Sequence, residues 1–249
     1  MDLSERPDAG SLREPWETAR FHHFQRVLAR AGLLGRPLRV LDIGSGDGWF
    51  AGQLLAKLPA GSTVTAWDHA YDPASLAALP EGVHGVRQAP AGERFDLVML
   101  LDVLEHVDDD EQMLGEAVAG QLAEGGHVLV SVPAWPALFG RHDEALGHFR
   151  RYRPAEARRL VDTAGLDRVL EGGLFGSLLA PRALQVALER RQPAPAGPPR
   201  PLAWSHGAVA AAVVDGCLRA DAAAGRVAAR AGAFVPGLSW WALCRRAHG

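Results

Sequence analysis

The sequence predicts an α/β fold in which helices cover both faces of one mostly parallel, seven-stranded sheet. Short apolar runs alternate with amphipathic stretches along most of the 249 residues, which is the pattern of parallel strands connected by helices. A chain of this length can bury one substantial core without a second globular unit. We therefore expect a single domain over residues 1–249.

The spacing of apolar residues predicts the individual elements. A leading helix over 16–31 has apolar side chains at helical spacing, and Gly32 follows it as a cap. Pro154 suits the first turn of a later helix, and Gly165 closes that helix. Strands are expected at 38–43, 63–67, 83–87, 95–101, 127–132, 168–170 and 239–246, and further helices at 49–58, 73–79, 108–123 and 154–164.

The C-terminal part of the chain predicts a helical insertion before the last strand. A Pro-rich run at 192–201 cannot hold regular structure, and it separates two Ala- and Leu-rich helical stretches at 178–190 and 201–231. The expected organisation is therefore an N-terminal helical lid (1–35), a core (36–173), the insertion (174–237) and a closing strand (238–249).

Composition excludes several classes of protein. The formal net charge of −3 does not suit a nucleic-acid binder, whose domains are usually basic. The two cysteines, Cys217 and Cys244, are far apart and form no disulfide framework or zinc motif. The N-terminus has no apolar signal region, and no stretch is apolar enough to span a membrane. We expect a cytoplasmic protein without stable membrane insertion.

A glycine-rich turn is the strongest functional motif. The apolar run that begins at Val40 leads directly into Gly44, Gly46 and Gly48, after which a helical pattern starts. Such a turn lets a ligand approach the backbone closely and presents the free N–H groups of a helix N-terminus. The spacing is G-x-G-x-G, whereas dinucleotide-binding domains usually have G-x-G-x-x-G. The observed spacing therefore favours a nucleotide-type ligand other than a dinucleotide such as NAD.

With Asp42 before its first glycine, this turn resembles motif I of the class I S-adenosylmethionine-dependent methyltransferases. The phrases at 95–108 and 125–133 resemble the fourth and fifth strands of the type 11-like, small-molecule branch of that family. The stretch at 141–152 resembles a segment of its bacterial members. The resemblance covers most of residues 16–170 and implies a Rossmann-like sheet with S-adenosylmethionine as the cofactor.

The same resemblance implies where the cofactor binds. Asp68 falls where the family holds the ribose diol, because a carboxylate can accept two hydroxyl hydrogen bonds. Trp16 and Arg20 match an aromatic and a basic position that relatives place over the cofactor. The chain departs from the pattern after the third strand, where Gln88 stands in a loop without the usual acid. The expected cofactor residues are Asp42, Gly44, Ser45, Gly46, Gly48, Asp68, His69, Gln88, Asp102, Trp16 and Arg20.

Methyl transfer from a sulfonium is a direct displacement, so the enzyme chiefly aligns the reacting atoms and excludes water. A general base assists when the acceptor is a hydroxyl or an ammonium group. His142 and His148 are our candidates, because both follow the fifth strand in a polar segment. We expect His106 to pack against or cap its helix. A metal site formed by His142, Asp143 and His148 lacks further ligands, so no metal is expected.

A local group of arginines follows these histidines: Arg150, Arg151, Arg153, Arg158 and Arg159. They could attract an anionic substrate, but we favour a solvated helix face that pairs with Glu156 and Asp162. The main functional hypothesis is methylation of an O, N or C atom of a small-molecule acceptor. The alternatives are a non-catalytic, cofactor-binding methyltransferase-like module, and an NAD-type oxidoreductase. A homodimer is a further expectation, and no nucleic-acid partner is expected.

Overall fold

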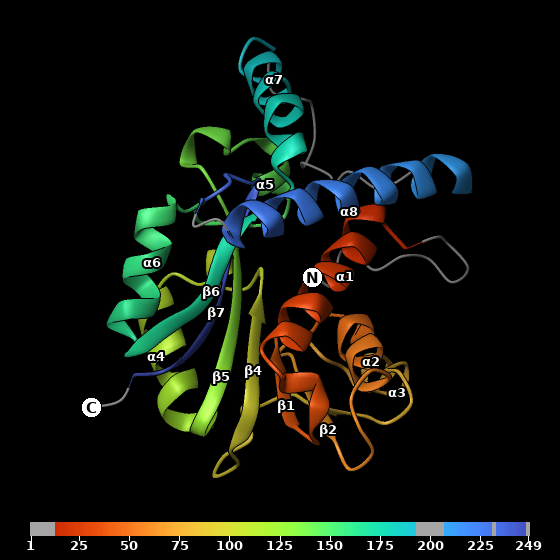
Figure 1. Ribbon diagram of the computed structural model, residues 1–249, viewed down its shortest axis with the longest axis vertical. Helices are drawn as coiled ribbons and strands as arrows, with labels where there is room; N and C mark the ends of the chain where they lie inside the picture. Colours follow the sequence, from red (N-terminus) through yellow and green to blue (C-terminus); the bar gives the residue numbers. More distant parts are fainter. Residues whose placement is uncertain (1–12, 193–206, 231–232, 248–249) are drawn as a thin grey trace.

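The computed structural model describes residues 13–192, 207–230 and 233–247, and it is built around one seven-stranded sheet (Figure 1). The strand order is β3-β2-β1-β4-β5-β7-β6. Adjacent strands from β3 to β5 are parallel, whereas β7 is antiparallel to both β5 and β6. The strands are β1 (Arg39–Ile43), β2 (Thr63–Trp67), β3 (Val83–Val86), β4 (Phe95–Leu101), β5 (Leu122–Pro133), β6 (Leu166–Leu174) and β7 (Ser239–Arg246). The predicted fold class is confirmed.

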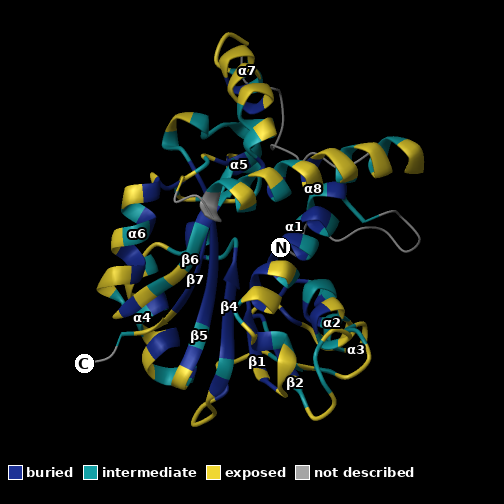
Figure 2. Cartoon of the chain, viewed as in Figure 1, coloured by how far each residue is buried: buried dark blue, intermediate teal, exposed yellow. Residues whose placement is uncertain are grey.

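Helices cover both faces of this sheet. Helices α4 (Asp110–Gln121) and α6 (Pro154–Thr163) pack on one face, in the same apolar cluster as Leu41 and Val98. Helices α1 (Pro15–Arg30), α2 (Trp49–Leu55) and α8 (Ala208–Arg230) pack on the other face, in the cluster that contains Val40 and Leu97. Because successive strand residues point to opposite faces, neighbouring residues of β1 and β4 enter different clusters. The sheet is therefore buried on both sides, as Figure 2 shows.

The boundary between α4 and β5 differs from the prediction. The helix ends at Gln121 and the strand begins at Leu122, whereas the sequence pattern favoured a helix to residue 123. Leu122 pairs with Phe95, and the register between β4 and β5 shifts directly after this pair. Pairing in the sheet thus overrides the local helical preference of the segment. Residues 122–126, which precede the apolar run at 127–132, therefore belong to the strand as well.

Strand β6 is longer than its apolar signal indicates. It runs over Leu166–Leu174, whereas residues 168–170 were expected. Its register against β7 shifts between Arg168 and Leu170, and this bulge interrupts the alternation of apolar and polar residues. The strand also lies at the edge of the sheet, where its exposed residues are one polar and one apolar, Asp167 and Val169.

The expected helical insertion lies between β6 and β7. It contains α7 (Leu179–Glu189) and α8, and Figure 1 shows α7 extending beyond the end of the sheet, near the short helix α5 (Arg141–Ala145). Helix α8 packs against α1, where Thr18 donates a hydrogen bond to Asp215. The predicted Pro-rich linker lies outside the described residues, apart from Gln192. Among the described helices, none is long and apolar enough to cross a membrane.

Candidate active site

Three adjoining cavities lie at the carboxyl ends of the parallel strands, where open α/β sheets bind their ligands. The glycine-turn cleft measures about 320 Å³ and includes Gly44, Asp68 and Asp102 in its wall. The arginine recess is smaller and lies between Arg20 and Asp42. The histidine cavity measures about 340 Å³. Gly44 lines both the cleft and the recess, Arg20 lines the recess and the cavity, and Asp102 lines the cleft and the cavity.

The glycine turn forms the floor of the cleft. The Gly44 N–H donates to the Trp67 carbonyl at 2.8 Å, so the turn after β1 is fixed to the end of β2. Gly44 has a φ of 64°, and a Cβ at this position would lie 2.6 Å from Cγ2 of Val103. The position therefore requires glycine for both its conformation and its close neighbour. Ser45 is buried beside it and shares a 2.6 Å hydrogen bond with the Tyr71 hydroxyl.

Asp68 lies at the end of β2, where the sequence placed the ribose ligand. Its Oδ2 accepts the Gly46 N–H at 3.0 Å and its Oδ1 accepts the Ala70 N–H at 2.9 Å. Each carboxylate oxygen has a second acceptor site, so Asp68 can still accept hydrogen bonds from a diol in the cleft. The structure therefore brings this acid and the glycine turn together.

His69 and Gln88 lie farther from the centre of the site. The His69 side chain lines the cleft but is 95% exposed. Gln88 is exposed and lines an open depression with His69, Val86 and Arg87 rather than the cleft. Gln88 therefore lies outside the glycine-turn cleft.

The arginine recess combines opposite charges in a buried space. Burial, together with the nearby carboxylates of Asp68 and Asp47, raises the pKa of Asp42 to about 7 against the opposing influence of the Arg20 guanidinium. A bound ammonium group would favour the ionised form of Asp42. Arg20, which pairs with Asp102, adds a positive charge to the wall of the same recess. The recess therefore suits the charged end of an α-amino acid.

His148 and His142 both line the histidine cavity. His148 Nδ1 lies 3.1 Å from Oδ1 of the fully buried Asp143. The Nδ1 atom of His142 is buried and has no hydrogen-bond partner among the described residues. Burial lowers the pKa of His142, and the Arg182 guanidinium lowers it further. Of the two predicted histidines, only His148 is oriented by a carboxylate.

Asp143 is the centre of an ion-pair network. Burial acts to raise its pKa, but hydrogen bonds from His148, Arg151 and the Gly140 N–H hold that pKa well below its usual range. Arg182 also donates to it, at 2.7 Å. An ionised carboxylate only accepts hydrogen bonds, so His148 Nδ1 carries the proton. In this tautomer the Nε2 atom of His148 carries the lone pair that can accept a proton.

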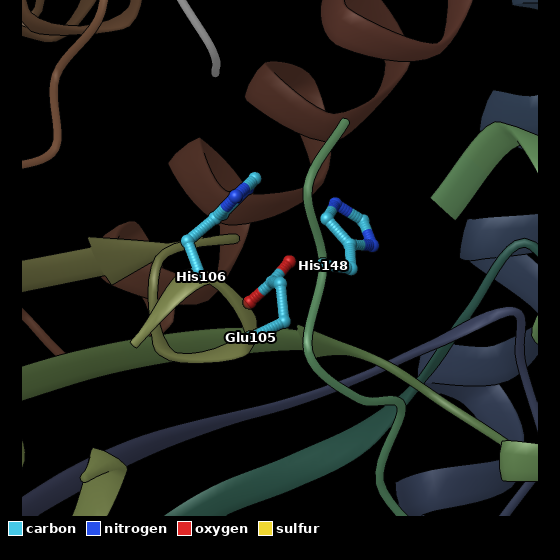
Figure 3. A group of neighbouring side chains, drawn as sticks. All are labelled: Glu105, His106 and His148. Carbon is cyan, nitrogen blue, oxygen red and sulfur yellow. The ribbon is translucent and has the colours of Figure 1, made fainter. Parts of the chain in front are cut away.

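Glu105 and His106 lie next to His148, and the three side chains converge on one space (Figure 3). The rings of His106 and His148 are 4.6 Å apart and perpendicular. Glu105 is completely buried, and neither of its oxygens has a hydrogen-bond partner among the described residues. Burial and the Asp102 charge raise the pKa of Glu105 well above its usual value. One carboxylate and two imidazoles within 4.8 Å of one another can also hold a divalent cation.

The sequence predicted no metal, because it showed too few ligands around His142, Asp143 and His148. Asp143 is occupied by His148 and two guanidinium groups, so it cannot join His142 and His148 as a ligand. Glu105 is the carboxylate that His148 approaches instead. Glu105 stands beside His106 in the turn after β4, and this neighbourhood was visible in the sequence. The packing of these two side chains against His148 is visible only in the fold.

The expected solvated arginine face is wrong for Arg151. This side chain is buried, and it pairs with Asp143 at 2.7 Å. Arg153 does pair with Glu156 on the exposed side of its helix, and Asp162 pairs with Arg168. Arg182, which enters the site from α7, was missed. No local motif marks it, because only the placement of the insertion brings it to the site.

The leading helix completes the wall. Trp16, Glu17 and Arg20 all line the histidine cavity, and Glu17 and Arg20 also line the arginine recess. Arg20 thus lies where the arginine recess meets the histidine cavity. Trp16 faces the histidine cavity and is not part of the glycine-turn cleft.

The seven-stranded sheet with its antiparallel β7, the glycine turn after β1 and the acid after β2 define a Rossmann-like class I methyltransferase. The family described as "Methyltransferase domain" matches residues 16–171. The chain belongs to this family, so it is an S-adenosylmethionine-dependent methyltransferase. The alternative of an NAD-type oxidoreductase does not fit that assignment.

Curated relatives share part of the chain. A ubiquinone biosynthesis O-methyltransferase from Idiomarina loihiensis is 29% identical over 170 residues, which cover 58% of this chain and 67% of the relative. An enzyme of the same description from Aeromonas salmonicida is 30% identical, with 54% of this chain and 64% of the relative covered. The chain thus matches about two thirds of the length of these relatives.

A solved structure extends the likeness to the whole fold. The S-adenosylmethionine-dependent methyltransferase from Mesorhizobium loti has a TM-score of 0.53 and covers 90% of this chain and 98% of its own. Its sequence identity is 15%, so this likeness shows the fold alone.

Proposed function

We propose that this enzyme transfers a methyl group from S-adenosylmethionine to a hydroxyl oxygen of a small aromatic acceptor, with His148 as the general base. The observation that carries the proposal is the Asp143–His148 pair at 3.1 Å, which leaves Nε2 of His148 as a proton acceptor in the histidine cavity. The printed descriptions of the two curated relatives as O-methyltransferases support an oxygen acceptor.

The cavities fit the parts of S-adenosylmethionine. Asp68 would hold the ribose diol in the glycine-turn cleft, while Asp42 and Arg20 would hold the ammonium and carboxylate groups in the arginine recess. The cofactor supplies a sulfonium methyl group for direct displacement. Asp102 lines both the cleft and the histidine cavity, so the acceptor would approach from the histidine cavity.

His148 is suited to a phenolic hydroxyl. A phenol has a pKa of about 10 and an imidazolium about 6.5, so proton transfer to histidine is only moderately uphill and can accompany methyl transfer. The ionised Asp143 holds the imidazole in one tautomer and stabilises the imidazolium that forms. Apolar side chains of the cavity wall, including Leu146, Phe175 and Leu238, exclude water from the nucleophile.

Steady-state kinetics with a panel of phenols and catechols tests this proposal. His148→Asn places an amide N–H where Nδ1 lies and can keep the hydrogen bond to Asp143 but cannot accept the proton, so we expect kcat to fall by about 100-fold or more, with S-adenosylmethionine affinity unchanged. His142→Asn is the matched control, because His142 lines the same cavity without a carboxylate partner. An unchanged kcat in His148→Asn, or the absence of turnover with every hydroxyl acceptor, would contradict the proposal.

A further inference from the structure

The histidine cavity contains two arginines that share one carboxylate. Arg151 Nε donates to Asp143 Oδ1 and Arg182 Nη2 donates to Asp143 Oδ2, both at 2.7 Å. All three side chains are buried. Two guanidinium charges thus face a single negative charge, and a buried excess charge is unfavourable unless a further group balances it.

The other carboxylates of the cavity do not balance this excess. Asp102 forms an ion pair with Arg20, and Glu17 forms an ion pair with Arg13 at 3.1 Å. Glu105 forms no ion pair with either arginine within the described part of the chain. Asp143 is therefore the one carboxylate with which Arg151 and Arg182 pair among the described residues.

Both arginines also keep donors for a ligand. Arg151 directs Nη1 to the Ala134 carbonyl, and Arg182 directs Nε to the Leu138 carbonyl. Nη2 of Arg151 and Nη1 of Arg182 make no hydrogen bond within the described part of the chain. These two nitrogens are also absent from the fully enclosed, unpartnered atoms of that part, so they retain contact with open space. Both residues line the cavity.

The rest of the cavity wall is largely apolar. Its carbon-rich side chains come from α1, from the segment after α5 and from the insertion, and they include Trp16, Leu146, Phe175, Leu178, Pro181 and Leu238. A volume of about 340 Å³ is sufficient for a substituted aromatic ring. The cavity thus offers an apolar space with a positive group on one side and His148 nearby.

We propose that the methyl acceptor carries a carboxylate, which Arg182 and Arg151 bind while the acceptor hydroxyl faces His148. This inference rests on the proposed O-methylation and names its substrate class, an aromatic hydroxy acid. Arg182 comes from the insertion, so the insertion supplies substrate specificity as well as apolar wall. Asp143 serves both functions, because it orients His148 and positions the two guanidinium groups.

Calorimetric binding to the protein saturated with S-adenosylhomocysteine tests the carboxylate site without requiring turnover. The probes are 3,4-dihydroxybenzoate and its methyl ester, which have the same ring and hydroxyls but differ in charge. We expect the acid to bind at least about tenfold more tightly than the ester, since charge-assisted hydrogen bonds to arginine are strong. Equal binding of acid and ester, or no binding of the acid at millimolar concentration, overturns the inference.

Arg182→Gln assigns the preference to its residue. Glutamine can keep a hydrogen bond to Asp143, and Arg151 still balances the Asp143 charge, so the fold should survive. The acid–ester preference should fall to nearly one. Arg190→Gln is the matched control, because Arg190 follows α7 directly, is exposed and lies outside the cavity. An unchanged preference in Arg182→Gln overturns the assignment.

Two further results keep the outcomes distinct. If Arg182→Gln does not fold, the acid–ester comparison in the wild-type protein still decides the inference. Methyl transfer to 3,4-dihydroxybenzoate, measured separately, tests the proposed function. Tight binding of the acid without methyl transfer would contradict O-methylation and leave the carboxylate site in place. Methyl transfer to both acid and ester, together with equal binding of the two, would support O-methylation and overturn the carboxylate site.

Discussion

Arg20 of α1 forms an ion pair with Asp102, the residue that follows β4. Asp102 is held in place by Ser131 of β5, whose hydroxyl donates to Oδ1 at 3.1 Å, and it adopts a positive φ of 56°. Burial acts to raise the pKa of Asp102, but the Arg20 guanidinium lowers it below its usual value. The ion pair therefore fixes α1 at the point where the glycine-turn cleft meets the histidine cavity.

Substitution of Arg20 should weaken cofactor binding. Arg20→Gln removes the positive charge of the arginine recess, so we expect S-adenosylmethionine affinity to fall by about 10- to 100-fold, the range of a lost charge-assisted contact. Calorimetric titration measures the change. Arg26→Gln is the control, because Arg26 is an exposed residue of the same helix and lines neither cavity nor recess. Equal affinities in the two variants would show that Arg20 has no part in cofactor binding.

Gly44→Ala should destabilise the protein and abolish cofactor binding. A left-handed conformation costs a residue with a side chain about 1–2 kcal/mol, and the new Cβ would also collide with Val103. Gly92→Ala separates these effects, because Gly92 has a φ of 75° but no atom within 4 Å of its added Cβ. Chemical unfolding should show a larger loss for Gly44→Ala. Similar losses in both variants would mean that the collision is relieved at no cost.

His23 should make stability dependent on pH. Burial, together with the nearby guanidinium groups of Arg226 and Arg26, lowers the pKa of His23 to about 3. The unfolded chain, with a histidine pKa of about 6.5, binds the proton first, so stability is complete above that pH and falls as the pH drops towards 3. At pH 5 the loss is about 2 kcal/mol.

The measurement for His23 is the urea midpoint between pH 7.5 and pH 4.5. His23→Gln should be less stable than the wild type at pH 7.5 but should lose less stability on acidification. His84→Gln, at an exposed position, should follow the wild-type curve. If His23→Gln and the wild type keep a constant difference in stability over this range, His23 is not protonated on unfolding.

Glu105 should have the opposite pH dependence. Its pKa is raised by burial and by Asp102, so its contribution is complete below the usual pKa of glutamate and is lost as the pH rises towards the folded value. Glu105→Gln should therefore gain stability relative to the wild type from pH 5 to pH 8. Thermal unfolding in a chelating buffer measures this, because a cation held by Glu105, His106 and His148 would keep Glu105 ionised. A difference that does not change with pH would contradict a protonated Glu105.

The sequence predicted the parts of the site that depend on the ends of strands. Asp42, Gly44 and Asp68 each follow a strong apolar run, and parallel strands bring their carboxyl ends to one edge of the sheet. The strand order came only from the structure, because apolar patterns do not specify which strands pair. The bounds of β6 were less well predicted, because a bulge interrupts its alternation.

The histidine cavity could be predicted only in part. His148 was a candidate from its position after the fifth strand, but its partner Asp143 gave no sign of being buried among arginines. Arg151 belongs to a run that is typical of a solvated helix face, whereas Arg182 comes from α7, almost forty residues after Asp143. Contacts between distant segments determine burial and ion pairing here, and no periodicity within either segment encodes them.

The most direct test of this account is calorimetric binding of S-adenosylmethionine, S-adenosylhomocysteine and NAD to the wild type and to Asp68→Ala. We expect both sulfur-containing ligands to bind with micromolar affinity, NAD not to bind, and Asp68→Ala to lose at least about tenfold in affinity because the ribose diol loses its acceptor. Tighter binding of NAD, or equal affinity for S-adenosylmethionine in both proteins, would contradict the cofactor site described for this chain.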